Sequence, residues 1–492
     1  MTQKKTPGLL LSSIPVLALV LVLVAGVTLF GEDVTSGASQ IALLTGAVVA
    51  SLIAVYHLKI PWAEVEEKIG DNVNKTSGAI FILLMIGALT STWMLSGVVP
   101  TMIYWGLKII SPKWFLLITF LLCAIISLLA GSSWTTVGTI GVAMLSAGRM
   151  IGLPPEWLAG AIISGAYLGD KVSPLSDTTN LSSSIAGVDL YKHIRYMVIT
   201  TIPALVICLI LYGVAGFMIP VSENVDIENQ MGAICNTFNI SGWLFLIPCA
   251  TIAMIVMKVS PFLTLFLSAL IGGIAAFFVQ PDIIAGITSL DGFKGLLYSV
   301  LKMMSSPVDI NTGDALMSSL TSTGGMAGMI NTVWIILCVT AFGGALQAAG
   351  MIDAITHSVL RFMKNTVSVV GTTVFTCIFC NIILADQFMS IVLPGRLFAD
   401  VYRKKGLAPE LLSRTLEDSA TVSSVLVPWN TCAVVQAGVL GIATLEYLPY
   451  AFFCFVTPII AILIAAFNFK IHRIPVIAEN NPETDIISDT ID

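Results

Sequence analysis

A strongly polar stretch, Gly169–Asn180, lies in the middle of a highly apolar chain. Asp170 and Asp177 place two carboxylates there, and Lys171 adds an ammonium group. Hydroxyl and amide groups surround Pro174; they belong to Ser173, Ser176, Thr178, Thr179 and Asn180. A charge at the centre of a membrane helix costs about 3 kcal/mol, so it persists where it faces a cavity or a partner. Because proline also removes a backbone donor, the segment predicts an ion site on a broken membrane helix.

Sodium prefers hard oxygen ligands, which these side chains provide. We predict a Na⁺ site at Asp177 with Ser176, Thr178 and, from a later segment, Asn430. Proton coupling needs a group that binds either the cation or a proton, and a poorly solvated carboxylate can do both. Asp177 is the first choice for this role, followed by Asp418 and Asp386. The wider set of candidate cation or proton ligands also contains Ser173, Thr179, Asn180, Asp170, Thr431 and Glu417.

Simpler interpretations of the same residues stay open. Asp170 and Lys171 could form a loop at a helix end or an internal ion pair, or Lys171 could extend to a membrane interface. The segment 177–180 could have no role beyond capping the next helix, since Asp and Ser favour the N-cap position. Arg414, Glu417 and Asp418 could line an ordinary cytoplasmic helix.

The elements that must position these side chains are membrane helices. The chain has 492 residues, 56% hydrophobic and 11% charged, whereas soluble domains carry about 25% charged residues. Apolar runs near the length of a membrane span recur: Leu9–Phe30, Ile41–Val55, Gly78–Leu95, Phe115–Leu129, Ile194–Phe217, Trp243–Met257, Pro261–Phe278, Val333–Ala349, Ser368–Ala385 and Tyr450–Phe467. With interrupted runs between them, we predict an all-α polytopic membrane protein with about 10–13 transmembrane helices.

An internal duplication organises these helices. Gly152–Leu158 matches Gly406–Leu412, an offset of 406 − 152 = 254, and the same offset places Pro174 opposite Pro428. The segment 131–136 then lies opposite 385–390, so that each half has two polar breaks. Transporters are commonly built from two such repeats, often inverted, with broken or re-entrant helices at the substrate site.

The duplication suggests the domain limits. We expect a first transmembrane helix at 1–30, an N-terminal repeat at 31–205, connecting helices and a loop at 206–313, a C-terminal repeat at 314–468 and an acidic cytoplasmic tail at 469–492. Lys4 and Lys5 precede the first span and Lys470 follows the last, so both termini are expected in the cytoplasm.

Composition excludes several classes of function. A net charge of −6 gives no reason to expect nucleic-acid binding. Cys377 and Cys380 form a lone pair with no second pair nearby, and the four histidines form no zinc-protease motif, so we expect no metal or other cofactor. The residues 167–170 approach the Gly-x-Gly-Asp pattern of intramembrane proteases, but Tyr167 replaces the required glycine. We therefore expect a transporter and not an enzyme.

The ordered polar segments resemble the NhaC family of sodium:proton antiporters. The resemblance extends over about residues 40–465 and rests on Gly165–Leu181, Trp93–Tyr104, Ala385–Arg396, Leu412–Ser419 and Val427–Thr431. It implies secondary active transport in a bacterial cytoplasmic membrane, with Na⁺ exported in exchange for H⁺. The same resemblance includes exchangers of sodium and organic acids such as malate and lactate.

Two transport functions therefore stay open. One is Na⁺/H⁺ antiport, whose partners are the sodium ion, the proton and the lipid bilayer. The alternative is sodium-coupled exchange of small carboxylates or amino acids, in which Asn430 and Arg414 would bind the solute. A channel would instead pass sodium currents that ignore the proton gradient. The sequence leaves stoichiometry, ion preference and oligomeric state open, with a homodimer as one option.

Overall fold

Helices dominate the computed structural model, which describes residues 7–30, 37–109, 111–219, 227–310, 318, 322–352 and 360–475. The helices of the first half are α1 Leu9–Phe30, α2 Ala38–Leu52, α3 Trp62–Leu95, α4 Val98–Ile109, α5 Pro112–Ala130, α6 Ser133–Thr136, α7 Val142–Met150, α8 Pro155–Val172, α9 Asp177–Ala186 and α10 Leu190–Met218. Two π-helices, η2 Ile53–His57 and η3 Val137–Gly141, continue α2 and α6.

The connecting region and the second half are helical as well. Their helices are α11 Ile227–Thr237, α12 Leu246–Val256, α13 Pro261–Val279, α14 Pro281–Ile287, α15 Gly292–Ser305, α17 Ile330–Ala348, α19 Thr366–Leu384, α20 Gln387–Lys404, α21 Pro409–Leu416, α22 Thr431–Leu440, α23 Thr444–Tyr447 and α24 Phe452–Ala466. Short 3₁₀ helices lie at η4 Gly242–Phe245, η5 Ala327–Met329, η6 Leu360–Phe362, η8 Ser424–Leu426 and η9 Leu448–Tyr450, and a π-helix, η7 Glu417–Thr421, extends α21.

The described residues confirm the prediction of an all-α polytopic membrane protein with broken helices. Within the described part of the chain, seven helices are long and apolar enough to cross a membrane, and the number is ten if each of three sharply bent pairs is one span. Ten is the lower end of the predicted range. One bent pair joins Pro409–Leu426 to Thr431–Leu440 at 49°, which places a break at the proline predicted to interrupt that run.

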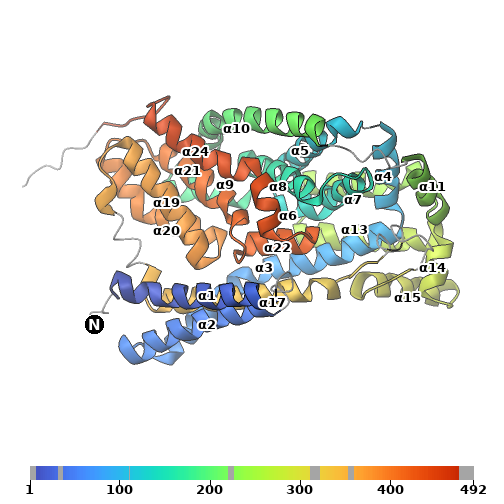
Figure 1. Ribbon diagram of the computed structural model, residues 1–492, viewed down its shortest axis with the longest axis horizontal. Helices are drawn as coiled ribbons and strands as arrows, with labels where there is room; N and C mark the ends of the chain where they lie inside the picture. Colours follow the sequence, from blue (N-terminus) through green and yellow to red (C-terminus); the bar gives the residue numbers. More distant parts are fainter. Residues whose placement is uncertain are drawn as a thin grey trace, which may run out of the picture.

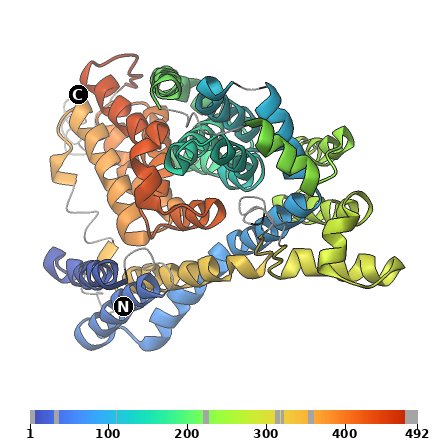
Figure 2. The same ribbon diagram turned by 45° about the vertical axis from the view of Figure 1, so that its right-hand side comes forward.

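The helices form two layers (Figures 1 and 2). α1, α2, α3 and α17 pack together along one side, and α13 and α15 extend that layer. α5–α10 and α19–α24 form the other layer. Within it, α9 packs on α20, α21 and η7, whereas α22 packs on η3, α7 and α17. The short helix after each break therefore contacts the opposite half of the chain.

The duplication predicted from sequence recurs in the backbone. Three pairs of residues with a left-handed backbone conformation are 254 positions apart: Gly131 and Ala385, Gly152 and Gly406, and Gly187 and Gly441. The helices α9 and α22 also begin at equivalent positions, Asp177 and Thr431. The π-helices do not correspond, since η3 begins at Val137 and η7 at Glu417. The domain limits and the inversion of the two halves stay predictions.

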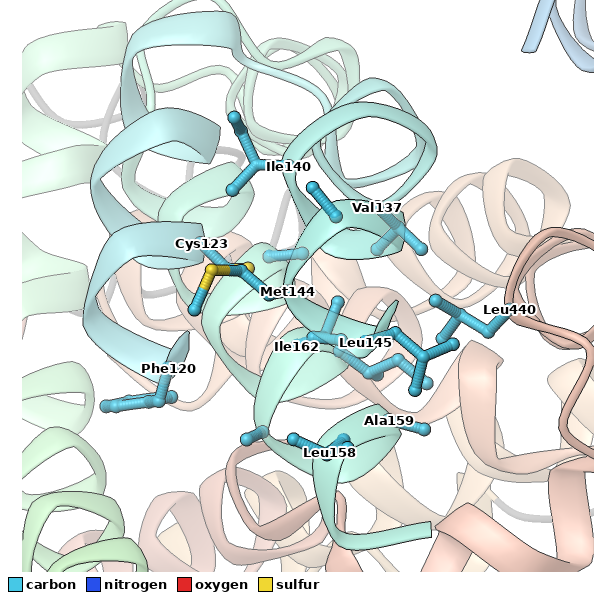
Figure 3. Packing of buried hydrophobic residues seen from close by; sticks show 14 of the residues in the cluster. Phe120, Cys123, Val137, Ile140, Met144, Leu145, Leu158, Ala159, Ile162 and Leu440 are labelled. Carbon is cyan, nitrogen blue, oxygen red and sulfur yellow. The ribbon is translucent and has the colours of Figure 1, made fainter. Parts of the chain in front are cut away.

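Close packing of α8 on α5 fixes the end of α8. A Cβ atom at Gly165 would overlap the carbonyl oxygen of Phe120, and one at Gly169 would overlap that of Ala124. Small residues four apart let two membrane helices approach closely. Figure 3 shows part of the apolar core around this contact, which includes Phe120 and Cys123 of α5 and Ile162 of α8. The rigid contact holds Asp170, one residue beyond Gly169, in place.

Candidate functional site

The first predicted break separates α8 from α9 at residues 173–176. Pro174 cannot donate a backbone hydrogen bond, and the Ser173 amide instead turns back to the Asp170 carbonyl at 3.1 Å. The Thr179 hydroxyl donates to the Lys171 carbonyl at 2.9 Å, which satisfies a free acceptor at the end of α8. Asp177 is the first residue of α9, and the N-cap Ser176 makes no side-chain capping bond. The Asp177 carboxylate is therefore not used as a helix cap.

The other polar residues of this break support its shape. The Ser173 hydroxyl donates to the Leu128 carbonyl at 2.8 Å, which joins the break to the end of α5. The Asn180 amide donates to the carbonyls of Ser176 and Pro174 at 2.8 and 3.1 Å. Ser173, Thr179 and Asn180 thus have structural partners, whereas Ser176 and Thr178 share a hydrogen bond of 3.1 Å next to Asp177.

A cleft of about 480 Å³ opens at this break. Its lining comes from α3, the α5–α6 turn, the break itself, the turn before α13 and the start of α20. The polar lining residues are Lys75, Ser132, Ser133, Thr135, Asp170, Ser176, Asp177, Thr178, Lys258, Ser260 and Gln387. Asp177 is exposed in the cleft, and Asp170 is buried at its wall. The structure therefore brings Asp170, Ser176, Asp177 and Thr178 together.

Asp170 is oriented by the short helix α6. The Ser133 amide donates to Asp170 Oδ2 at 3.0 Å, an interaction between a helix N-terminus and a negative charge that is favourable. The Asp170 and Asp177 carboxylates also interact electrostatically with each other. Two like charges that share a cleft are relieved by a cation between them. The arrangement can hold a sodium ion by carboxylate and hydroxyl oxygens.

The second break, residues 427–430, lies between η8 and α22. Asn430 accepts from the Cys432 amide at 3.0 Å as the N-cap of α22, and its own amide donates to the Asn381 carbonyl at 3.2 Å. Thr431 donates its backbone N–H to the Ala385 carbonyl at 2.9 Å. Neither Asn430 nor Thr431 is among the described residues that line the cleft.

Asp386 is the N-cap of α20 and precedes Gln387, which lines the cleft. Its carboxylate accepts from the Met389 amide at 2.8 Å, as an N-cap does. The following residue, Gln387, lines the cleft and donates to the Thr421 carbonyl at 3.2 Å. The second half therefore reaches the cleft through the start of α20.

A buried ion pair joins the two halves behind the cleft. Lys171 Nζ lies 2.5 Å from Asp418 Oδ1, and both side chains are fully buried. The hydroxyls of Thr200 and Thr201 on α10 lie 2.9 Å from Asp418 Oδ1 and 3.1 Å from Lys171 Nζ, respectively. The alternatives in which Lys171 pairs with Asp170 or extends to an interface are therefore wrong.

The charged residues of α21 and η7 belong to the same interior. Arg414, Glu417 and Asp418 are all fully buried, so they do not line an exposed helix face. Arg414 Nε lies 3.7 Å from Asp418 Oδ2, and the Arg414 guanidinium lies 4.4 Å from the centre of the Tyr196 ring. Glu417 Oε1 accepts a hydrogen bond of 2.8 Å from the Ser182 hydroxyl on α9.

Sequence reasoning missed two parts of this site. It did not place the segment 132–135 or Gln387 at the cleft, although the duplication had marked both segments as polar breaks. It also did not predict the partner of Lys171, and no local signal in the sequence indicates it. Groups of three or more His, Cys, Asp or Glu side chains that could hold a metal ion do not occur among the described residues.

Comparisons with known proteins agree with this architecture. A family model described as the Na⁺/H⁺ antiporter family matches residues 8–196 and 165–469. The Na(+)/H(+) antiporter NhaC of Alkalihalophilus pseudofirmus is 35% identical over 86% of this chain and 89% of its own length. The arginine/ornithine antiporter ArcD of Halobacterium salinarum is 33% identical over 95% of this chain and 94% of its own length. The malate-2H(+)/Na(+)-lactate antiporter of Bacillus subtilis is 35% identical over 86% of this chain and 88% of its own length.

Proposed function

Since the chain belongs to the Na⁺/H⁺ antiporter family, we propose that it exports Na⁺ in exchange for H⁺ across a bacterial cytoplasmic membrane. Its cargo is the sodium ion and the proton, with no bound cofactor. Lys4 and Lys5 before the first span and Lys470 after the last support a cytoplasmic location of both termini.

One observation carries this proposal. Asp170, Ser176, Asp177 and Thr178 line a single cleft at the α8–α9 break. Carboxylate and hydroxyl oxygens are the ligands that hard cations prefer. Transporters place such sites at discontinuous helices, where side chains and free backbone carbonyls can coordinate the ion. The α8–α9 break supports sodium binding on these grounds.

Everted membrane vesicles test the exchange. Respiration or ATP acidifies the vesicle interior, and a fluorescent weak base reports the pH gradient. We expect NaCl to dissipate the gradient with no organic acid present, whereas choline chloride should not. Vesicles without the protein are the control. If NaCl leaves the gradient unchanged at every pH tested, antiport of Na⁺ against H⁺ alone is rejected.

A second candidate function is sodium-coupled exchange of a small carboxylate or amino acid. Lys75 and Lys258 line the same cleft as Asp177, and a volume of about 480 Å³ is far larger than one sodium ion needs. Small-molecule sites commonly have volumes of about 300–1,000 Å³ with a few charged groups. Two relatives are antiporters of organic solutes by name.

The same vesicles distinguish the two candidates. Dissipation that occurs only after malate, lactate, arginine or ornithine is supplied with NaCl would favour the second candidate. Lys75→Ala and Lys258→Ala should then weaken solute-dependent transport. Under the first candidate, both variants keep transport with NaCl alone.

A further inference from the structure

Glu417 is a buried carboxyl group that lies outside the cleft. Its side chain, in the π-helix η7, is fully buried. Glu417 is not one of the described residues that line the cleft. Glu417 Oε1 accepts one hydrogen bond of 2.8 Å from Ser182, and Glu417 Oε2 has no hydrogen-bond partner in the described chain. π-helical turns occur frequently at functional sites.

The cations near Glu417 are already paired with its neighbour. Lys171 Nζ lies 2.5 Å from Asp418, and Arg414 Nε lies 3.7 Å from the other oxygen of Asp418. No ion pair joins either cation to Glu417 in the part of the chain that the structure describes. A fully buried carboxylate without a paired cation is strongly unfavourable, and such a group binds a proton instead.

Charged groups reach Glu417 from few directions. Asp170 and Lys171 act on it from α8, and the Thr421 hydroxyl faces it within η7. α9 contributes Ser182, α21 contributes Arg414, and η7 contributes Asp418. α19 and α24 contain no charged residue, and the charged residues of α20, including Arg396 and Asp400, are exposed. Asp170 is therefore an acid of the cleft wall whose charge acts on Glu417.

The helix α9 connects Glu417 to the cleft. Asp177 is its first residue, and Ser182 lies five positions later in the same helix, which is about 7.5 Å along the axis. A single rigid helix therefore bears both an exposed acid of the cleft and the donor to Glu417. A movement of α9 on sodium binding would displace the Ser182 hydroxyl that donates to Glu417.

We propose that Glu417 is the proton-binding site of this transporter and that Asp170 and Asp177 bind sodium in a separate cleft, with Asp170 and the helix α9 coupling the two sites. This inference rests on the proposed function. Sodium in the cleft neutralises the field of Asp170, so that Glu417 can ionise. When Glu417 binds a proton, its negative charge no longer repels that of Asp170. The sodium ion that offset this repulsion is then bound less tightly and leaves. The coupling is reciprocal, as thermodynamic linkage requires.

Charge balances in this exchange. When Na⁺ enters the cleft, the O–H bond of Glu417 breaks, its electron pair stays on the carboxylate oxygen and the proton passes to water. When the proton returns, the Glu417 O–H bond forms again and Na⁺ is released. The net charge of the buried groups is the same in both states, which avoids the cost of an extra charge in the membrane.

Glu417→Gln tests the inference because it imitates the protonated group. The purified full chain is reconstituted into liposomes, and two quantities are measured: proton movement on addition of NaCl, and exchange of ²²Na⁺ for Na⁺ without a pH gradient. We expect Na⁺-driven proton movement to fall at least tenfold. We expect sodium exchange to require a higher Na⁺ concentration, because the variant imitates the state that releases sodium, and to lose the pH dependence that the unaltered protein shows.

Glu410→Gln is the matched control. Glu410 is a second buried acid of the same segment, but Lys192 Nζ and His472 Nδ1 pair with it at 3.0 and 3.2 Å. Its replacement should leave coupling intact. Retained Na⁺-driven proton movement in Glu417→Gln, unaltered pH dependence of its sodium exchange, or equal loss in both variants would overturn the inference.

Ser182→Ala keeps the inference testable if Glu417→Gln does not fold. Loss of the Ser182 hydroxyl makes the charged form of Glu417 less favourable, so that proton release requires a higher pH. The pH profile of exchange should therefore move in the alkaline direction, and an unmoved profile would contradict the proposal. If the unaltered protein moves no protons on addition of NaCl, the proposed function itself fails.

Discussion

Lys171 Nζ lies 2.5 Å from Asp418 Oδ1, and this fully buried pair joins the last turn of α8 to the π-helix η7. Asp418 serves two cations, because Arg414 Nε lies 3.7 Å from its other oxygen. The pair therefore fixes the first half of the chain, at the broken helix, to the second half. Lys171 and Asp418 are not equivalent, since Asp418 compensates the charge of both Lys171 and Arg414.

Asp418→Asn should destabilise the protein more than Lys171→Met. The first change leaves Lys171 and Arg414 without their shared acid, and removal of one partner of a buried pair costs about 3–5 kcal/mol. The second change leaves Asp418 with Arg414 and with the Thr200 hydroxyl at 2.9 Å. Thermal unfolding of detergent-purified protein measures the order.

The double variant of this pair should be no less stable than Asp418→Asn alone. Replacing both Lys171 and Asp418 leaves a single buried cation, Arg414, instead of two, so that the two effects are not additive. Additive losses would show that the pair contributes nothing beyond its separate residues. Lys68→Met is a suitable control, since its pair with Asp71 at 3.4 Å is half exposed and is worth about 0–1 kcal/mol.

Asp177→Asn should abolish coupled transport and leave the protein in the membrane. The carboxylate is exposed in the cleft and makes no capping hydrogen bond, so its loss removes a cation ligand and little stability. Na⁺-dependent dissipation of the pH gradient should fall to the level of vesicles without the protein. Asp189→Asn is the control: Asp189 caps α10 by accepting from the Lys192 amide at 3.0 Å. Sodium-dependent proton movement retained in Asp177→Asn would remove Asp177 from the site.

Gly131→Ala should distort the cleft, whereas Gly187→Ala should not. Both glycines have a left-handed backbone conformation, with φ of 65° and 69°. Each substitution by alanine therefore adds strain of about 1–2 kcal/mol. A Cβ atom at Gly131 would also lie 2.6 Å from the backbone of Leu175 in the α8–α9 break, whereas nothing lies within 4 Å at Gly187. Transport assays should show loss only in Gly131→Ala. Similar transport by both variants would show that the break tolerates displacement of Leu175.

Tyr196→Leu should cost more stability than Tyr196→Phe. The hydroxyl of Tyr196 donates to the Lys470 carbonyl at 3.0 Å, and its ring faces the Arg414 guanidinium at 4.4 Å. The same hydroxyl accepts from the His472 amide at 3.3 Å, so phenylalanine loses two hydrogen bonds, about 1 kcal/mol each, and keeps the ring. Leucine also loses a desolvated cation–π contact of about 2 kcal/mol. Thermal unfolding compares the two, and equal losses would mean that the ring does not stabilise Arg414.

Local chemistry made the α8–α9 break predictable. Pro174 removes a backbone donor, and the hydroxyls around it are the partners that a broken helix needs, so sequence alone indicates both the break and its oxygen-rich character. The left-handed residues at Gly131 and Ala385 follow the 254-residue offset for the same reason, since each half closes its helices with the same turns. The long apolar runs likewise indicate the spans. These features depend on residues that are neighbours in the chain.

Only the tertiary structure decided which polar residues meet. Asn430 caps its own helix, while Gln387, from a different turn, lines the cleft. Lys171 pairs with Asp418 and not with its neighbour Asp170, because the end of α8 points one residue to the cleft and the next to η7. Such contacts depend on how helices from the two halves cross, which is set by packing over the whole molecule. The sequence determined what chemistry the breaks could offer, and the packing decided which charge faces which.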